Sequence, residues 1–214
     1  MLFSGGDLGT RIAGLLLSLP AVLWAITFHE FCHAWVAWKL GDKTAGFEGR
    51  VSLNPLVHLD PIGALMLLVV GFGWARPVPI NSRFFRNPRR DIVLVSLAGA
   101  GGNLLTAVVV AILFHLMPFF SPMILSMPMM GTFVRFLYTM LFMNVGLAVF
   151  NLIPIPPLDG SKVLSIFLPR SALPAYFWME QYGMFVLFAL IFTGVLQAVM
   201  SPIIRGIVSL LLNF

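Results

Sequence analysis

Two histidines and a glutamate stand close together in the segment HEFCH at residues 29–33. If this segment is helical, His29 and His33 lie four residues apart on one face, and both imidazoles can bind one metal ion. Glu30 lies beside that face, where a carboxylate can accept a proton from water at the metal. Two imidazoles and one carboxylate suit Zn²⁺, with a fourth position left for water. The alternative is a pair of structural histidines bonded to backbone carbonyls. It leaves ionisable groups unexplained in an apolar span, where each costs about 2.5 kcal/mol or more unless paired.

A zinc site of this kind needs a third protein ligand, and Asp159 in the segment PPLDG is the first candidate. The prolines before it forbid a regular helix, and Gly160 after it permits a turn that directs the carboxylate back toward the bundle. An Asp that simply caps a turn is the alternative interpretation. The competing acidic residues are Glu180, Asp91 and Asp60, of which the last two suit a helix cap and a turn better.

Depth along the helices brings an asparagine to the same level as the histidines. At 1.5 Å per residue, His33 lies about 9 Å and His29 about 15 Å from the basic end at Lys39. Asn103 lies about 18 Å above Asp91 and follows the small residues AGAGG, which let helices approach closely. An interhelical hydrogen bond and a catalytic role both fit Asn103.

The elements that position these residues must be membrane helices. Of the 214 residues, 59% are hydrophobic and only 10% are charged, whereas a soluble domain carries about 25% charged residues. Nearly uncharged runs of about 20 residues are typical of helices that cross a bilayer. This composition excludes a soluble enzyme and a nucleic-acid-binding module, and the single cysteine, Cys32, excludes an internal disulfide. The net charge of +5 indicates membrane topology rather than a nucleic-acid partner.

We therefore expect an all-α polytopic membrane protein in which residues 1–214 form a single domain. The full spans that we expect, about four in number, lie at roughly 12–38, 92–116, 132–153 and 183–204. The apolar run 62–74 is too short to cross, so we expect a re-entrant or interfacial segment there.

The polar segments between the spans predict smaller elements and an orientation. Extended patterns in 42–60 and 75–82 predict short β-strands at the membrane surface, and 161–168 predicts a short interfacial helix. Segment 117–130, with three prolines and no charge, predicts a loop. Basic residues gather at the ends of the spans on the side that carries these polar segments, so the positive-inside rule places that side in the cytoplasm and both termini outside.

The order of the motifs resembles the site-2 protease family of intramembrane zinc metalloproteases. The motifs are HEFCH, GRVSLNPLVHLDPIG, GWARPVPIN, AGAGGN and NLIPIPPLDG, and they extend from about residue 25 to 165. No PDZ domain stands between the spans, so the chain resembles the compact form of the family. The resemblance implies that His29, His33 and Asp159 bind one Zn²⁺ per chain and that Glu30 is the general base.

The resemblance also implies roles for two asparagines, since Asn103 and Asn151 would position the substrate peptide or its oxyanion. His58 could face the same cavity, although a loop histidine bonded to backbone is the simpler interpretation. The function implied is hydrolysis of peptide bonds within or near transmembrane segments of membrane-protein substrates, as in regulated intramembrane proteolysis. The expected location is a lipid bilayer, the inner membrane of a prokaryotic cell, with the active site toward the cytoplasm.

Two alternatives stay open at this point. In a membrane protease of the gluzincin type, a glutamate on a later helix is the third ligand, and only Glu180 could serve. A transporter or metal carrier could use the same cluster without hydrolysis, because ionisable residues inside a membrane also mark ion pathways.

Overall fold

The structure, a computed structural model, describes residues 8–70, 73–120 and 128–213, and these residues form helices without a β-sheet. The long helices are α1 (Leu8–Lys39), α4 (Pro88–Leu116), α6 (Pro128–Asn151), α8 (Leu173–Phe192) and α9 (Val195–Leu212). Five helices of the described residues are long and apolar enough to cross a membrane, against the four that we expected. The prediction of an all-α integral membrane protein is confirmed.

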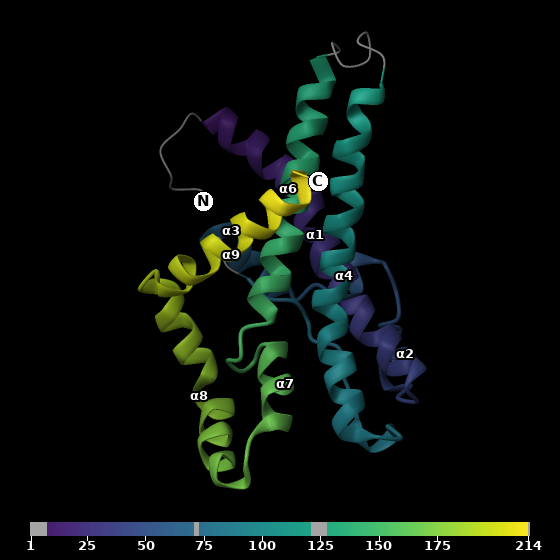
Figure 1. Cartoon of the computed structure of the whole chain (residues 1–214), viewed down its shortest axis with the longest axis vertical. Helices are drawn as coiled ribbons and strands as arrows, with labels where there is room; N and C mark the ends of the chain where they lie inside the picture. Colours follow the sequence, from purple (N-terminus) through teal and green to yellow (C-terminus); the bar gives the residue numbers. More distant parts are fainter. Residues whose placement is uncertain (1–7, 71–72, 121–127, 214) are drawn as a thin grey trace.

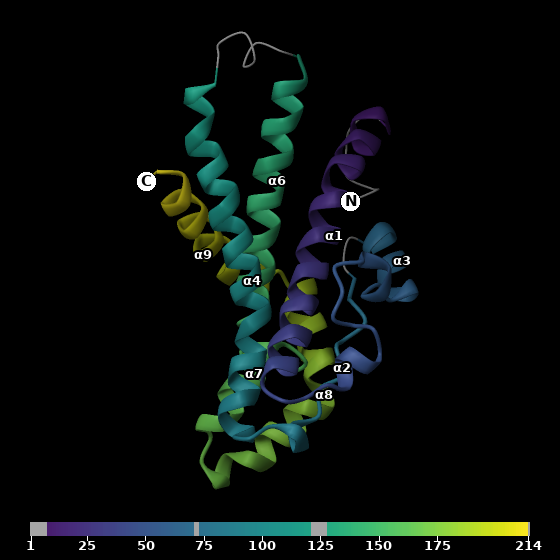
Figure 2. The ribbon, with the colours of Figure 1, turned by 90° about the vertical axis from the view of Figure 1, so that its right-hand side faces the viewer.

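Helices α1, α4 and α6 pack side by side and form the centre of the molecule (Figures 1 and 2). Their contact faces carry small residues. The buried alanines are Ala21, Ala25, Ala34 and Ala37 on α1, and Ala100, Ala107 and Ala111 on α4. Small side chains let membrane helices approach closely, since no hydrophobic force drives them together within lipid. Close packing of α1 on α4 brings polar groups in the middle of these helices within bonding distance.

The chain after α6 departs from a regular helix for seven residues and then forms α7 (Asp159–Phe167). The prolines of NLIPIPPLDG explain the interruption, because a proline lacks the N–H that continues a helix. We expected a short helix at 161–168, and α7 lies at that place. It packs against α4 and places Asp159 in its first turn.

The predicted single span 183–204 is wrong, because α8 ends at Phe192 and α9 begins at Val195. Gly194 between them has a φ of 74°. This left-handed backbone is readily adopted only by glycine, and it ends the helix. Helix α9 then crosses α6 obliquely (Figure 1) and packs on it through Ile204 and Val208.

The predicted β-strands are also wrong. The described part of 42–60 and 75–82 contains α2 (Thr44–Phe47), η1 (Pro55–Val57) and the first residues of η2 (Ser82–Phe84), with one isolated β-bridge between Leu59 and Ala75. The Arg50 guanidinium donates to the carbonyls of Val57, Arg76 and Pro77. Because a side chain takes these acceptors and prolines remove donors, the two segments cannot form a regular ladder.

The remaining elements are short. They are α3 (Pro61–Val70), η3 (Met117–Phe119) and η4 (Arg170–Ala172). Helix α3, about 15 Å long by its ten residues, is too short to span a bilayer and lies outside the central bundle on the side of α1 (Figure 2). Its re-entrant or interfacial placement stays a prediction. Of the predicted loop 117–130, residues 121–127 lie outside the described residues.

Candidate metal centre

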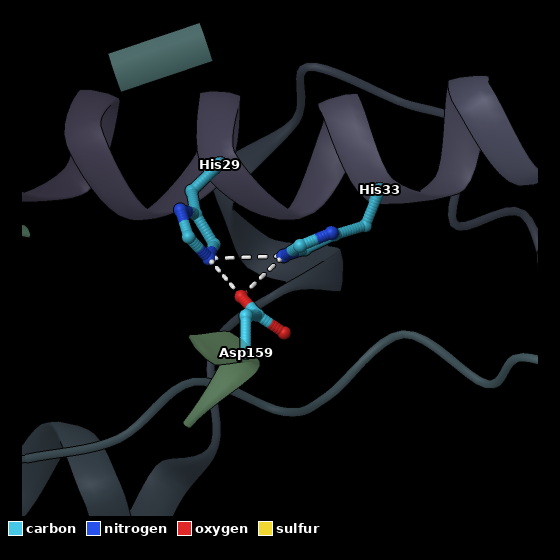
Figure 3. Close-up of side chains that lie close together, drawn as sticks. All are labelled: His29, His33 and Asp159. Carbon is cyan, nitrogen blue, oxygen red and sulfur yellow. Dashed lines mark hydrogen bonds and ion pairs between the residues drawn. The ribbon is translucent and has the colours of Figure 1, made fainter. Parts of the chain in front are cut away.

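Helix α1 places the two histidines of the HEFCH segment on one face. His29 and His33 are 4% and 5% exposed, and their Nε2 atoms are 3.0 Å apart. This proximity follows from the helix alone, because residues four apart lie one above the other. Both imidazoles point away from the axis of α1 toward the start of α7 (Figure 3).

Asp159 completes the cluster from a distant part of the chain. Its Oδ2 atom lies 2.9 Å from Nε2 of His33 and 3.2 Å from Nε2 of His29 (Figure 3). The other carboxylate oxygen, Oδ1, accepts a hydrogen bond of 3.1 Å from Nζ of Lys162, one turn further along α7. Both oxygens of the carboxylate are therefore engaged, and Oδ2 is directed at the histidines.

Gly160 explains how the backbone can place Asp159 there. A Cβ atom at this position would lie 2.6 Å from the carbonyl oxygen of Ile153 and closer still to that of Leu152. The turn that precedes α7 thus folds directly over residue 160, and a larger side chain would push the segment away. The hydroxyl of Ser161 donates to the carbonyl of Leu158 at 2.7 Å, which fixes the first turn of α7.

The charge state of Asp159, which lies outside the candidate spans, suits a metal ligand. Burial raises the pKa of its carboxyl, but hydrogen bonds with the two imidazoles and the nearby Lys162 ammonium outweigh burial and hold that pKa below its usual range. The group is therefore ionised at neutral pH, which is the form that binds a cation.

The far side of each imidazole also has a partner. Nδ1 of His29 lies 2.8 Å from Oδ1 of Asn103, and Nδ1 of His33 lies 2.6 Å from the carbonyl oxygen of Val95. Both partners are acceptors, so each Nδ1 carries a proton and donates it. In the neutral imidazole, each Nε2 then has a lone pair that faces the cluster, as outer partners of metal-binding histidines commonly arrange.

These contacts fit a zinc ion. When both imidazoles are neutral, three lone pairs, on two nitrogens and a carboxylate oxygen, face one another at 2.9–3.2 Å, and a proton or a metal cation between them relieves their repulsion. In a tetrahedral zinc site with ligand bonds of about 2.0–2.1 Å, neighbouring ligand atoms are about 3.3 Å apart. Among the described residues, His29, His33 and Asp159 are the group of His, Cys, Asp and Glu side chains close enough to share one ion.

Gly99 on α4 forms the wall behind the two imidazoles. A Cβ atom at this position would lie 2.5 Å from Cε1 and 2.7 Å from Nε2 of His29, and closer still to Nε2 of His33. The absence of a side chain at residue 99 therefore creates the space that the ligands occupy. Gly102, one turn further on, has the same relation to Cys32, whose Sγ would lie 2.5 Å from an added Cβ.

Glu30 follows the first histidine and lies beside the cluster. Its side chain is half-buried, and its Oε2 accepts a hydrogen bond of 3.3 Å from the backbone N–H of Val78. This bond ties the carboxylate to the extended segment after Arg76, which the Arg50 guanidinium also holds.

Comparisons with known proteins agree with this cluster. The sequence model of peptidase family M50 matches residues 122–194. A Bacillus subtilis protein named "Putative zinc metalloprotease YwhC" is 41% identical over 186 residues, which cover 85% of this chain and 83% of that protein. The chain belongs to peptidase family M50, the site-2 proteases.

Two further relatives support the M50 assignment. "Putative zinc metalloprotease Rip2" of Mycolicibacterium smegmatis is 32% identical and covers 87% of this chain and 68% of its own length. "Putative zinc metalloprotease MJ0611" of Methanocaldococcus jannaschii is 31% identical and covers 70% of this chain and 69% of its own length. No solved structure matches the chain. Zinc is the metal that these names specify, in agreement with the donor set.

The competing acidic residues of this M50 chain are engaged elsewhere. Asp60 accepts from the N–H of Gly63 at 2.7 Å and caps α3. Asp91 accepts from the N–H of Asn87 at 3.1 Å and pairs with Arg90, in the first turn of α4. Asp60 thus caps a helix, where we predicted a turn, and Asp91 lies inside the first turn of α4, whose N-cap is Asn87. Glu180 lies exposed on α8, outside the cluster.

The other predicted site residues do not join the three ligands directly. Asn103 contacts His29 from behind, as described above. Asn151 ends α6 half-buried, with Nδ2 donating to the carbonyl of Leu147 at 3.1 Å. His58 is fully buried, with Nε2 at 2.8 Å from the carbonyl of Ser52, which favours the backbone-bonded interpretation. Roles for Asn151 and His58 toward a substrate stay predictions.

One residue that the sequence analysis did not select belongs to the site's surroundings. Asn144 of α6 is fully buried, and its Oδ1 accepts a 3.0 Å hydrogen bond from Nδ2 of Asn103. An amide in the middle of an apolar span was the available signal, as it was for Asn103.

Proposed function

We propose that this M50 protein is an intramembrane zinc endopeptidase that hydrolyses peptide bonds within or near transmembrane segments of membrane proteins. The observation that supports it best is the convergence of three buried lone pairs from His29, His33 and Asp159, between helices apolar enough to span a bilayer. The proposal takes residues 1–214 as one metalloprotease domain and includes regulated intramembrane proteolysis as its biological setting.

His29, His33 and Asp159 would hold the zinc ion. Zinc in such a site lowers the pKa of a water molecule toward about 7 and polarises a carbonyl group. Glu30 would accept the proton of the attacking water and later give it to the leaving amine of the peptide. The N–H of Val78 holds the Glu30 carboxylate before substrate binds, because it donates to Oε2.

The substrate class follows from where the cluster lies. The ligands are buried between α1, α4 and the start of α7, and the outer faces of these helices expose large apolar side chains such as Leu16, Leu97 and Leu105. A substrate reaching this site from the bilayer carries a transmembrane segment. Its helix must unwind locally, since the carbonyls of a regular helix are already hydrogen-bonded.

The orientation in the proposal rests on basic residues. Lys39 ends α1, Lys43 and Arg50 follow it, five arginines lie between residues 75 and 90, and Lys162 follows Asp159. Cytoplasmic segments carry an excess of such residues, so we propose that the metal centre lies toward the cytoplasmic side of a prokaryotic inner membrane.

Cleavage by purified protein tests the proposal. Wild-type protein and the Glu30→Gln variant would be reconstituted in liposomes with single-span substrate proteins, and zinc would be measured by elemental analysis. We expect one zinc per chain in both, cleavage by the wild type, and a loss of at least about 10³-fold in the variant, within the range for a general base. Glu180→Gln, which removes an exposed carboxylate, is the matched control and should cleave normally.

Three outcomes would contradict the proposal. If Glu30→Gln cleaves at the wild-type rate, the carboxylate is not the base. If zinc binds but no single-span protein is cleaved, while the wild type and Glu30→Gln both move metal ions across the liposome membrane, the chain is a metal carrier. Zinc lost in Glu180→Gln and kept in Asp159→Ala would favour the gluzincin arrangement.

A further inference from the structure

A chain of buried hydrogen bonds runs from α6 to the metal ligand His29. Nδ2 of Asn144 donates to the carbonyl of Met140 at 2.8 Å, and Oδ1 of Asn144 accepts from Nδ2 of Asn103 at 3.0 Å. Nδ2 of Asn103 also donates to the carbonyl of Ala25 at 2.9 Å, and Oδ1 of Asn103 accepts from Nδ1 of His29 at 2.8 Å. Both asparagines are 0% exposed. Each hydrogen of the Asn103 amide and the oxygen that faces His29 thus has a protein partner.

The direction of the Asn103 amide decides which nitrogen of His29 is free to bind metal. With Oδ1 facing Nδ1 of His29, the ring carries its proton on Nδ1, and Nε2 presents a lone pair to the cluster. If the amide were turned over, its N–H group would face Nδ1 and would stabilise the other tautomer. That tautomer carries the proton on Nε2, where it blocks coordination.

Asn144 fixes this direction because its own amide has one favourable orientation. The Met140 carbonyl can only accept, so Nδ2 of Asn144 faces it and Oδ1 of Asn144 faces Asn103. An acceptor at that place requires the N–H₂ end of Asn103, and turning Asn103 over would bring two oxygens together. In a site without exposed surface, an unpaired polar group is destabilising because no water replaces the lost partner. Together with the Ala25 carbonyl of α1, which also accepts from Nδ2 of Asn103, a helix that contributes no ligand therefore holds the orientation that sets the ligand's tautomer.

We propose that Asn144 is a positioning residue that tunes the zinc affinity of the site through Asn103 and His29. The inference rests on the proposed function for the identity of the metal site, but it concerns metal binding alone. Asn144 cannot contact substrate, since it is fully buried. Its effect must reach the reaction through the geometry of His29.

Zinc affinity of the full chain in detergent, measured by competition with a chromophoric chelator, tests the inference. Asn144→Leu has the same number of side-chain heavy atoms, branched at the same carbon, but no acceptor, and we expect it to weaken zinc binding about tenfold, at the lower end of the range for outer-shell partners. Asn144→Asp keeps an acceptor for Asn103 and, in its protonated form, a donor for the Met140 carbonyl, so at a pH low enough to protonate it the zinc affinity should be close to that of the wild type at the same pH.

Two further variants separate positioning from folding. Asn144→Ser keeps a donor to the Met140 carbonyl, as serines in helices do, but is too short to reach Asn103. It should weaken zinc binding as Asn144→Leu does, and it serves if that variant does not fold. Thr106→Val is the control, because Thr106 is buried on α4 and bonds Trp24 and the Gly102 carbonyl, outside the Asn103 chain. It should lower the melting temperature without changing zinc affinity.

A spectroscopic readout completes the test. Co²⁺ in place of zinc absorbs visible light with a spectrum set by its ligand geometry, and at saturating Co²⁺ we expect an altered band in Asn144→Leu and an unaltered one in Thr106→Val. Wild-type zinc affinity in folded Asn144→Leu and Asn144→Ser would overturn the inference, as would equal losses in Thr106→Val. Failure of the wild type to bind zinc at all would instead overturn the proposed function.

Discussion

Replacing Gly99 with alanine should disable the metal centre without touching a ligand. The added Cβ would lie 2.5 Å from Cε1 and 2.7 Å from Nε2 of His29, and closer still to Nε2 of His33. Ordinary contacts begin near 3.4 Å, so the imidazoles or α4 must retreat by about 1 Å, whereas a metal site tolerates deviations of about 0.2 Å in its ligand distances.

Neither way of relaxing this contact preserves the site. If the imidazoles move, Nε2 of both histidines leaves its place opposite Asp159. If α4 moves, the 2.8 Å bond between His29 and Asn103 and the 2.6 Å bond between His33 and the Val95 carbonyl lengthen. Loss of one outer-shell partner costs 10–100-fold in metal affinity. Because Gly99→Ala strains both histidines, we expect zinc affinity to fall by at least about 100-fold, with cleavage falling in parallel.

Gly101→Ala is the matched control for this experiment. An added Cβ at residue 101 has no atom within 4 Å, and alanine is favoured over glycine inside a helix by about 1 kcal/mol. Zinc affinity by chelator competition should be unchanged in this variant, and its melting temperature should equal or exceed that of the wild type. If Gly99→Ala binds one zinc as tightly as Gly101→Ala, then α4 does not form the wall behind the ligands, and the description of the site is wrong.

Three other measurements follow from the same contacts. Asp159→Asn, a neutral ligand of equal shape, should weaken zinc binding at least about 100-fold because it removes the anionic donor. Glu180→Gln should leave zinc affinity unchanged, and equal affinities in the two variants would show that Asp159 is not a zinc ligand. Cys32→Ser should keep one zinc per chain by elemental analysis, because Sγ of Cys32 packs toward Gly102 rather than the cluster, and a loss of zinc there would identify the thiol as a ligand. Removing zinc with a chelator should lower the melting temperature. Zinc added back at about 100 times its Kd should raise the free energy of unfolding by about 2.7 kcal/mol. A melting temperature that does not change with zinc would show that the ion does not bind the folded state.

The local part of the site could be predicted from the sequence, because it depends on helix geometry alone. His29 and His33 share a face in any α-helix, so their spacing was sufficient. Asp159 could be chosen because few acidic residues stand at membrane depth and the prolines before it exclude a regular helix.

The second layer of the site could not be predicted, because it depends on how α1 and α4 align. The run of small residues indicated a close approach of two helices, but not that Gly99 would face the imidazoles while Gly101 faces outward. A shift of α4 by two residues would bring Gly101 to the place of Gly99. Likewise Asn144 joins the site only because α6 packs beside α4 at that depth.

The errors in the fold have physical causes as well. Mean hydropathy could not locate the break between α8 and α9, since the residues on both sides of Gly194 are apolar, and the left-handed φ of that glycine decides it. The strand prediction considered alternation along the chain. It could not include the Arg50 guanidinium, which takes backbone acceptors from two segments that a sheet would have paired.

The distance along the chain between the ligands has a consequence for biosynthesis. Two donors are synthesised early, at residues 29 and 33, but the third follows only at residue 159, after α1, α4 and α6 have been made. Synthesis proceeds from the N-terminus, so a nascent chain that has inserted its first helices still lacks a complete centre. With the proposed function, such a chain would stay inert beside newly made membrane proteins until α7 packs on α4.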